Sequence, residues 1–243
     1  MSAVAKRERK PTPAEAMFLL ENGATMDQPT FHELYKLTPD GFKAELIGGT
    51  VFVASPVSGF HAAPHARLVA WMILYMDATP GVDVYDNATN ILENAGEPQP
   101  DAALLISPEF GGRTRFDSEG FIHGAPELVA EVAHSSASID LGDKLKLYEA
   151  AGTREYLVAL VREKKLRWFM RSKSGLVEQQ PGSQGVLKSV AFPGLWLSAP
   201  RFFRPVVRHW IQLLNEGLAS PEHAAFVAEL KARRAKSRKR KGK

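Results

Sequence analysis

Four side chains between positions 101 and 144 have the chemistry of a metal-dependent hydrolytic site. Two are carboxylates at the start of, or inside, apolar runs, and two are an acid and a lysine spaced four residues apart: Asp101, Glu131, Asp140 and Lys144. Carboxylates supply the hard oxygen ligands that Mg²⁺ and Mn²⁺ prefer, and a lysine ammonium can stabilise negative charge developing on a phosphate. The pattern around them predicts strand, strand, helix and strand, which would gather the four groups at one sheet edge.

The neighbours of Asp101 and Glu131 predict where each lies. Asp101 follows Pro-Gln-Pro at 98–100 and precedes the apolar run 102–106, and because the prolines exclude a helix it should lie at the start of a strand. By itself, it could equally cap the preceding turn. Glu131 lies inside the apolar run 128–133, where a buried carboxylate needs a partner and a cation is the usual one.

Helix geometry favours Lys144 over Lys146 as the catalytic lysine. Apolar residues at 141, 145 and 148 form a stripe that should face the sheet. At ~100° per residue, Lys144 lies about 60° from the centre of this stripe and Lys146 about 140° away. Only Lys144 is therefore expected to reach Glu131.

Three further residues are candidates, each with a plainer alternative. Asp140 would contact substrate, or would form only a helix-surface ion pair with Lys144 worth ~0.3–0.5 kcal/mol. Glu45 would complete the carboxylate cluster as a catalytic residue, or would be the exposed start of a strand. His61 would contact a substrate phosphate from a helix entrance, or would cap or pack there. His61 and His65 also form an HxxxH pair that could bind zinc, although no HExxH glutamate lies between them.

The elements that must position these residues are those of a mixed α/β sheet. Expected helices cover 13–22, 30–37, 61–77, a segment capped by Ser138 and ended by Gly152, 200–214, and the chain from 221 onward. Expected strands cover 43–54 as a hairpin or bulged strand, 82–92, 102–106, 128–133, 155–161 and 166–171, with one or two more in 187–197. The segment 107–124 is expected to be a long loop.

Composition excludes several classes of protein. The chain has 243 residues, of which 44% are hydrophobic, and no cysteine, so disulfide frameworks and thiolate zinc sites are excluded. It lacks an apolar leader or a run of membrane-spanning length, so we expect a soluble, cytoplasmic protein. We expect an N-terminal lead and helix over 1–27, a main α/β domain over 28–200, and a helical extension with a basic tail over 201–243.

The net charge of +4 is unevenly distributed. Residues 231–243 contain nine Lys or Arg and no acid, which leaves 22 basic against 27 acidic residues in the remainder. Blocks of like charge repel one another, so the tail is expected to be disordered beyond about Ala235. It would either solubilise the protein or bind phosphates.

The order of these motifs resembles the Uma2 family of putative restriction endonucleases. The resemblance covers roughly residues 28–195 and rests on the following segments: Glu45-Leu46-Ile47-Gly48-Gly49, Ser55-Pro56, His61, Pro100-Asp101, Glu127 to Val132, Asp140, Lys144, Tyr148 and Gly152 to Tyr156. It implies a PD-(D/E)XK nuclease fold, with a mixed central sheet flanked by helices and a divalent-metal site. Asp101 and Glu131 would be the metal-binding carboxylates, and the backbone carbonyl of Val132 a third oxygen ligand. The general nuclease motif has lysine where this chain has Ala133, and Lys144 looks like its replacement.

The function expected from these features is hydrolysis of DNA phosphodiester bonds by an endonuclease that uses Mg²⁺ or Mn²⁺. Such an enzyme would be a homodimer if it cuts both strands. A nuclease-fold protein that binds nucleic acid or regulates without turnover is the main alternative. A zinc hydrolase that uses His61 and His65 is a third.

Overall fold

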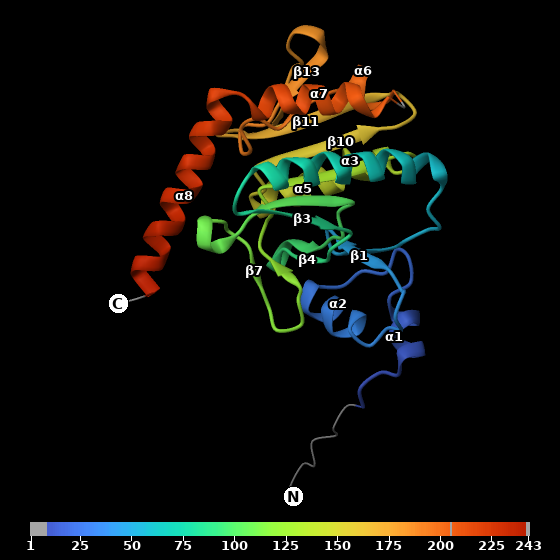
Figure 1. Cartoon of the computed structure of the whole chain (residues 1–243). Helices are drawn as coiled ribbons and strands as arrows, with labels where there is room; N and C mark the ends of the chain where they lie inside the picture. Colours follow the sequence, from blue (N-terminus) through green and yellow to red (C-terminus); the bar gives the residue numbers. More distant parts are fainter. Residues whose placement is uncertain (1–8, 205, 242–243) are drawn as a thin grey trace, which may run out of the picture.

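A six-stranded mixed sheet forms the centre of the molecule (Figure 1). The computed structural model describes residues 9–204 and 206–241. The strands lie in the order β12 (Gly175–Glu178), β11 (Lys165–Ser172), β10 (Glu155–Leu160), β9 (Leu128–Ala133), β6 (Ala102–Ile106) and β3 (Val82–Asp86). Strands β9 and β10 pair in parallel, and the other neighbours pair antiparallel. The predicted mixed α/β sheet is confirmed.

Side chains along β9 alternate between two apolar layers, one on each face of the sheet. Leu128, Ala130 and Val132 join the layer beneath α3 (Gly59–Ala78). Val129 and Ala133 join the opposite layer, beneath α5 (Asp143–Ala151). Because side chains alternate along a strand, the residue between these two, at position 131, also faces α5.

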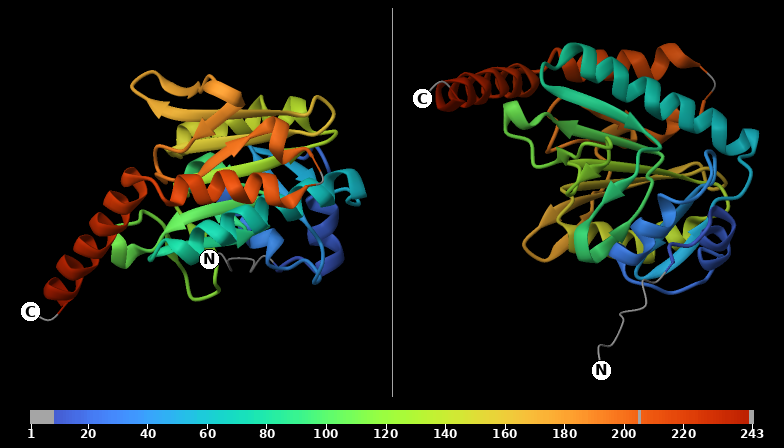
Figure 2. Two further views of the ribbon diagram at one scale, coloured as in Figure 1. Left: turned by 45° about the horizontal axis from the view of Figure 1, so that its top comes forward. Right: turned by 90° about the horizontal axis from the view of Figure 1, so that it is seen from below.

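The C-terminal helices belong to the α3 layer. The hairpin of β13 (Val186–Lys188) and β14 (Trp196–Ser198) leads into α6 (Ala199–Phe202), α7 (Val207–Leu218) and α8 (Pro221–Lys241). Trp210, Leu214 and Leu230 from α7 and α8 are buried in the same cluster as Trp71 of α3. The far half of α8 extends beyond the body of the protein (Figures 1 and 2).

The N-terminal part of the chain forms a smaller layer with its own apolar cluster. Helices α1 (Pro13–Leu19) and α2 (Gln28–Tyr35) pack with a three-stranded sheet of β2 (Thr50–Val53), β1 (Ala44–Ile47) and β5 (Gly96–Glu97). Thr12 and Glu15 form the capping box that starts α1. Gly48 and Gly49, with φ of 58° and 80°, make the two-residue turn between β1 and β2, a turn that needs positive φ at both positions.

The segment 107–124, expected to be a loop, contains short elements. They are η2 (Pro108–Phe110), β7 (Arg115–Phe116) and β8 (Ile122–His123), and β8 pairs with β4 (Asn90–Ile91). Two other short 3₁₀ turns are η1 (Glu93–Ala95) and η3 (Ser183–Gly185). The strand predicted over 82–92 is thus divided between β3 and β4, and the helix predicted over 200–214 between α6 and α7.

The single helix predicted between Ser138 and Gly152 is wrong. It is two helices, α4 (Ala137–Asp140) and α5, and Ser138 lies inside α4 instead of capping it. Gly142 separates them with φ −108° and ψ −96°, outside the helical region. A Cβ at this position would lie 2.5 Å from the Ser138 carbonyl oxygen, so the break needs glycine.

The disorder predicted beyond about Ala235 is also wrong for the described residues, because α8 continues to Lys241. Leu230 is fully buried and fixes the first half of α8 against the core. The unfavourable free energy of helix nucleation is therefore offset before the basic residues begin, and these residues only extend an existing helix. Lysine, arginine and alanine are strong helix formers, and Glu229 bonds Arg233 one turn on at 2.7 Å. Residues 242–243 lie outside the described part of the chain.

No helix in the described ranges combines the length and the apolar character needed to cross a membrane.

The buried contacts of α7 give a test of whether the C-terminal helices belong to the central core. Leu214→Ala removes a fully buried side chain and should lower the free energy of unfolding by about 2–5 kcal/mol. Leu19→Ala removes a side chain that is 46% exposed and should cost less than about 1 kcal/mol. Urea denaturation of both variants measures the difference, and equal losses would show that α7 contributes little to the core.

Candidate active site

Asp101 and Glu131 lie side by side at the start of β6. Ala102 pairs with Ala130 across the antiparallel ladder, so continuing the register by one residue places Asp101 opposite Glu131. The Asp101 N–H lies 3.4 Å from Glu131 Oε2, and Asp101 Oδ2 accepts a 2.7 Å hydrogen bond from the N–H of Val132. The two carboxylates predicted to share a metal are therefore neighbours.

Glu131 is paired with a buried lysine. Lys144, in the first turn of α5, places Nζ 2.9 Å from Glu131 Oε1 and 3.0 Å from Glu45 Oε1. Glu131 is 3% exposed and Lys144 6% exposed. The Tyr148 hydroxyl, one helical turn beyond Lys144, donates to Glu131 Oε1 at 3.3 Å. Glu45 Oε1 also accepts from the N–H of Gln99 at 2.6 Å, which ties β1 to the segment before Asp101.

Lys146 lies outside the cluster. Its side chain is 80% exposed and pairs with Asp143 at 3.2 Å. The helix geometry that distinguished Lys144 from Lys146 thus agrees with their positions, although the catalytic role of Lys144 stays a prediction.

Asp140 is not part of a helix-surface ion pair, because both it and Lys144 are buried. Its Oδ2 accepts a 2.6 Å hydrogen bond from Ser136, and its backbone carbonyl accepts one from the Tyr156 hydroxyl at 2.9 Å. These two hydrogen bonds hold the end of α4, and with it Asp140, in place beside the cluster. Its predicted contact with substrate is untested.

The cluster holds more negative than positive charge. Burial raises the pKa of Glu131 well above its usual 4.5; Lys144 lowers it, and the charge of Asp101 raises it further. Burial also raises the pKa of Asp140, and the charge of Lys144 only partly offsets this. Burial alone would lower the pKa of Lys144, but Glu131 and Glu45 hold it above its ordinary 10.5. Such a group of carboxylates around one ammonium favours uptake of either a proton or a further cation.

Asp101 has a different environment on its other side. His61 Nε2 lies 3.1 Å from Asp101 Oδ2, and His65 Nε2 lies 2.8 Å from the Asp101 carbonyl oxygen. Burial acts to raise the pKa of Asp101, but the hydrogen bond and charge of His61 outweigh it, so the pKa lies below 3.8. The hydrogen bond to Asp101 in turn raises the pKa of His61 above 6.5, against the effect of burial.

The structure brings together all seven predicted site residues. Their positions come from strands or strand edges, from α3, and from α4 and α5: Glu45, His61, Asp101, Glu131, Val132, Asp140 and Lys144. Sequence reasoning assigned Tyr148 to the apolar stripe and to the family resemblance, but it missed the hydrogen bond from Tyr148 to Glu131. The i,i+4 spacing of Tyr148 from Lys144 was the available signal, because it puts both residues on one helix face.

The donor set fits a divalent cation. Asp101 and Glu131 supply oxygens, and the surplus of carboxylates is the charge environment that such an ion neutralises. Both histidines of the HxxxH pair also approach Asp101. Among the residues that the structure describes, one cluster of potential ligand atoms meets within 4.8 Å, and it consists of His61, His65 and Asp101.

Known proteins resemble this chain in family and in fold. Residues 29–200 match the family model Uma2, described as putative restriction endonuclease. The fold is similar to the crystal structure of a putative nuclease belonging to DUF820 from Anabaena variabilis, with a TM-score of 0.55 and 14% sequence identity. The similarity covers 71% of this chain and 96% of that one. No curated protein matches the chain.

The buried ion pair predicts a pH-dependent loss of stability when the lysine is removed. Lys144→Met leaves Glu131 without its cation and should cost about 3–5 kcal/mol at neutral pH. The loss further raises the folded-state pKa of Glu131, so the folded state holds a proton that the unfolded state releases above about pH 4.5. Stability of the variant should therefore fall relative to wild type as pH rises above about 4.5.

The measurement is urea denaturation from pH 4 to 8 in the presence of EDTA. Lys146→Met removes an exposed lysine and should stay within about 0.5 kcal/mol of wild type throughout. Equal deficits for the two variants, or a Lys144→Met deficit that does not change with pH, would contradict the buried pairing.

Proposed function

The chain belongs to the Uma2 family, and from this premise we propose that it is a divalent-metal-dependent endonuclease that hydrolyses DNA phosphodiester bonds. One observation carries the proposal: Asp101 and Glu131 lie side by side, with the buried ammonium of Lys144 on Glu131. A structural ion pair alone does not need a second carboxylate beside it. Two acids and a fixed cation at one point are the groups that phosphodiester hydrolysis uses.

Asp101 and Glu131 would hold Mg²⁺ or Mn²⁺, with the backbone carbonyl of Val132 as a further oxygen ligand. The bound ion would supply a water of lowered pKa and neutralise charge on the phosphate. Asp101 is held ready for this role by the Val132 N–H and by His61, which keep it ionised. Glu131 is held by Lys144 and Tyr148, so neither carboxylate needs to reorganise greatly.

Lys144 would act as a fixed positive charge and not as a base. Its pKa is held above the ordinary value by Glu131 and Glu45 despite burial, so it stays protonated at neutral pH. A protonated lysine cannot accept a proton from water, but it can stabilise the charge that develops in the transition state. Glu45 would orient it from the opposite side, at 3.0 Å.

His61 and Asp140 would border the bound substrate, as the sequence suggested. His61 lies in the first turn of α3 beside Asp101, and Asp140 ends α4 on the α5 side. Cleavage of both strands of a duplex would need two such sites, so a homodimer is part of the proposal.

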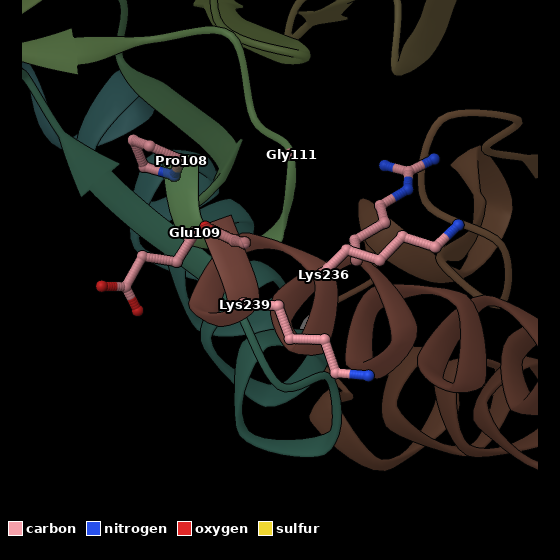
Figure 3. A pocket seen from close by; sticks show the side chains of 7 residues that line it. Pro108, Glu109, Gly111, Lys236 and Lys239 are labelled. Atoms are coloured by element: carbon pink, nitrogen blue, oxygen red, sulfur yellow. The ribbon is translucent and has the colours of Figure 1, made fainter. Parts of the chain in front are cut away.

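The basic half of α8 would bind the DNA backbone. A groove of about 580 Å³ lies beside the contact between this helix and η2, and Arg233, Lys236 and Lys239 line it. Figure 3 shows the Lys236 and Lys239 side chains extending away from the carboxylate of Glu109. Asp101 precedes β6, and α8 packs on η2, which follows the other end of this strand. The seven residues of extended chain from Asp101 to Pro108 span roughly 20 Å, which is the approximate distance between the groove and the carboxylates.

A second candidate function is nucleic-acid binding without turnover. One observation favours it: Glu131 Oε1 already accepts hydrogen bonds from Lys144 and Tyr148, so this oxygen is occupied by protein groups that a metal ion would have to compete with. Such a protein would keep the fold and the basic surface but would not cleave.

Cleavage assays decide between the two. Supercoiled plasmid should be cut with Mg²⁺ or Mn²⁺ and left intact with EDTA. Asp101→Asn and Glu131→Gln should each abolish cutting and weaken Mn²⁺ binding measured by calorimetry, while circular dichroism shows an unchanged fold. Metal-dependent binding with no cutting of plasmid, linear duplex or single strand would favour the second candidate.

The role of Lys144 is tested by single-turnover cleavage. Lys144→Ala should slow the chemical step by at least about 10²-fold, as does loss of one group that stabilises transition-state charge, and should leave DNA affinity nearly unchanged. Lys146→Ala is the matched control and should cut at the wild-type rate. Equal rates for the two variants, or a larger defect at Lys146, would overturn the assignment.

The role of α8 is tested by the salt dependence of DNA binding. Deleting residues 231–243 should flatten the log–log salt slope by roughly four units if about half of the nine cations contact phosphates. Because Arg234 also stacks on Phe110 at 5.0 Å, a milder variant is needed: Lys236, Arg238 and Lys239, all exposed, changed to Gln.

The triple variant should flatten the slope by about two to three units. Lys173→Gln, which removes an exposed cation at the β11–β12 turn, should not change it. An unchanged slope in both the truncated and the triple variant would leave the tail as a solubilising segment.

A further inference from the structure

His61 and His65 both place Nε2 against Asp101, one at its carboxylate and the other at its backbone carbonyl. They lie four residues apart in α3, which puts both on one face of the helix. His61 Nε2 contacts Asp101 Oδ2 at 3.1 Å, and His65 Nε2 contacts the Asp101 carbonyl at 2.8 Å. The other nitrogen of His61, Nδ1, is buried without a partner. In both rings, Nε2 is therefore the nitrogen that faces Asp101.

We propose that His61, His65 and Asp101 form a binding site for a transition-metal ion, of the Zn²⁺ or Mn²⁺ class, which shares Asp101 with the oxygen site but uses two histidines in place of Glu131. One ligand atom from each residue lies within 4.8 Å of the others. In a tetrahedral site with bonds of ~2.1 Å, two ligand atoms lie about 3.4 Å apart, so side-chain rotations that shorten these separations would close the site. Two imidazoles and a carboxylate suit first-row transition metals, whereas Mg²⁺ takes oxygen ligands.

Asp86 gives the site a fourth donor. Its Oδ1 lies 2.8 Å from His65 Nε2, and its side chain is 55% exposed, so it can turn toward the ion or away from it. With the exposed Asp86 carboxylate turned away, the three partly buried ligands leave a fourth position for water or a phosphate oxygen. That is the arrangement of a site that binds substrate and not of a closed structural one.

The site shares Asp101 with the proposed nuclease centre, and only in this respect does it rest on the proposed function. A shared carboxylate can bridge two ions, one held with Glu131 and one held with the two histidines. The histidines make this second position prefer Mn²⁺ or Zn²⁺ over Mg²⁺. Without a metal, the same contacts would be ordinary hydrogen bonds that hold Asp101 in place.

Metal binding can be measured without any substrate. Calorimetry on the full chain, first freed of metal with a chelator, should show one Zn²⁺ per chain. His61→Gln, His65→Gln and Asp101→Asn should each weaken Zn²⁺ binding by about 100-fold or more; even loss of a residue that only supports a ligand costs 10–100-fold. His209→Gln, which changes a histidine of α7 outside the cluster, should bind Zn²⁺ as wild type does.

Glu131→Gln separates this site from the oxygen site, because it should weaken Mg²⁺ binding and leave Zn²⁺ affinity within a few fold. Co²⁺ provides a spectroscopic check: its visible absorption bands should change when either His61 or His65 is replaced. Thermal unfolding of each variant confirms that it is folded.

The proposal is overturned if wild type binds no Zn²⁺, if the two histidine variants bind it as wild type does, or if His209→Gln weakens binding equally. Stoichiometric Zn²⁺ binding that depends on both histidines supports it even in a protein that cuts no DNA. Such a result would count against the proposed function alone. Cleavage that needs Mg²⁺, together with Zn²⁺ binding that is unaffected by the histidine variants, would support the function and overturn this site.

Discussion

The need to neutralise a carboxylate inside the sheet determines much of the architecture around it. Glu131 lies in a central strand with apolar residues on both sides, and an isolated charge there would cost several kcal/mol. Lys144 offsets that cost only if the first turn of α5 lies over Glu131 of β9. The helix break at Gly142 determines where α5 begins, and the Tyr148 hydroxyl donates to Glu131 from the next turn of the helix. The positions of α4 and α5 thus follow from one buried charge.

The site joins elements from both faces of the sheet. Helix α3 brings its first turn to Asp101 from one face, and α5 brings Lys144 to Glu131 from the other. Glu45 links the small N-terminal sheet to the same point through Lys144 and Gln99. The polar cluster is therefore held by three separate layers, each with its own apolar core. Such support keeps charged side chains in one geometry, as preorganised sites require.

Local patterns in the sequence were enough to predict most strands of the central sheet and to place Asp101 before one strand and Glu131 inside another. Prolines before Asp101, the apolar run around Glu131 and the capping box at Thr12 each act over a few residues, so the sequence records them directly. The break between α4 and α5 was missed because a glycine inside a helical pattern is often tolerated. Only the contact with the Ser138 carbonyl makes Gly142 necessary.

Features that depend on tertiary contacts were the least predictable. The charge run suggested disorder in the tail, but Leu230 is buried in the core and carries the helix into the basic segment. The approach of His65 to Asp101 depends on the rotation of α3 over β6, which local spacing cannot fix. The hydrogen bond of Tyr148 to Glu131 likewise follows from the packing of α5 on β9.

Because the basic segment is helical, its charges are arranged regularly, and this affects which form of nucleic acid they would complement. A helix fixes the backbone positions of its cationic residues at steps of about 1.5 Å per residue, and only the side chains remain free to adjust. Duplex DNA is stiff over about 150 base pairs and already holds its phosphates at regular intervals. Two such arrays can meet without either backbone losing conformational entropy, whereas a flexible single strand must first be ordered. In the proposed DNA-binding role, preorganisation of α8 would thus favour the double-stranded form through entropy.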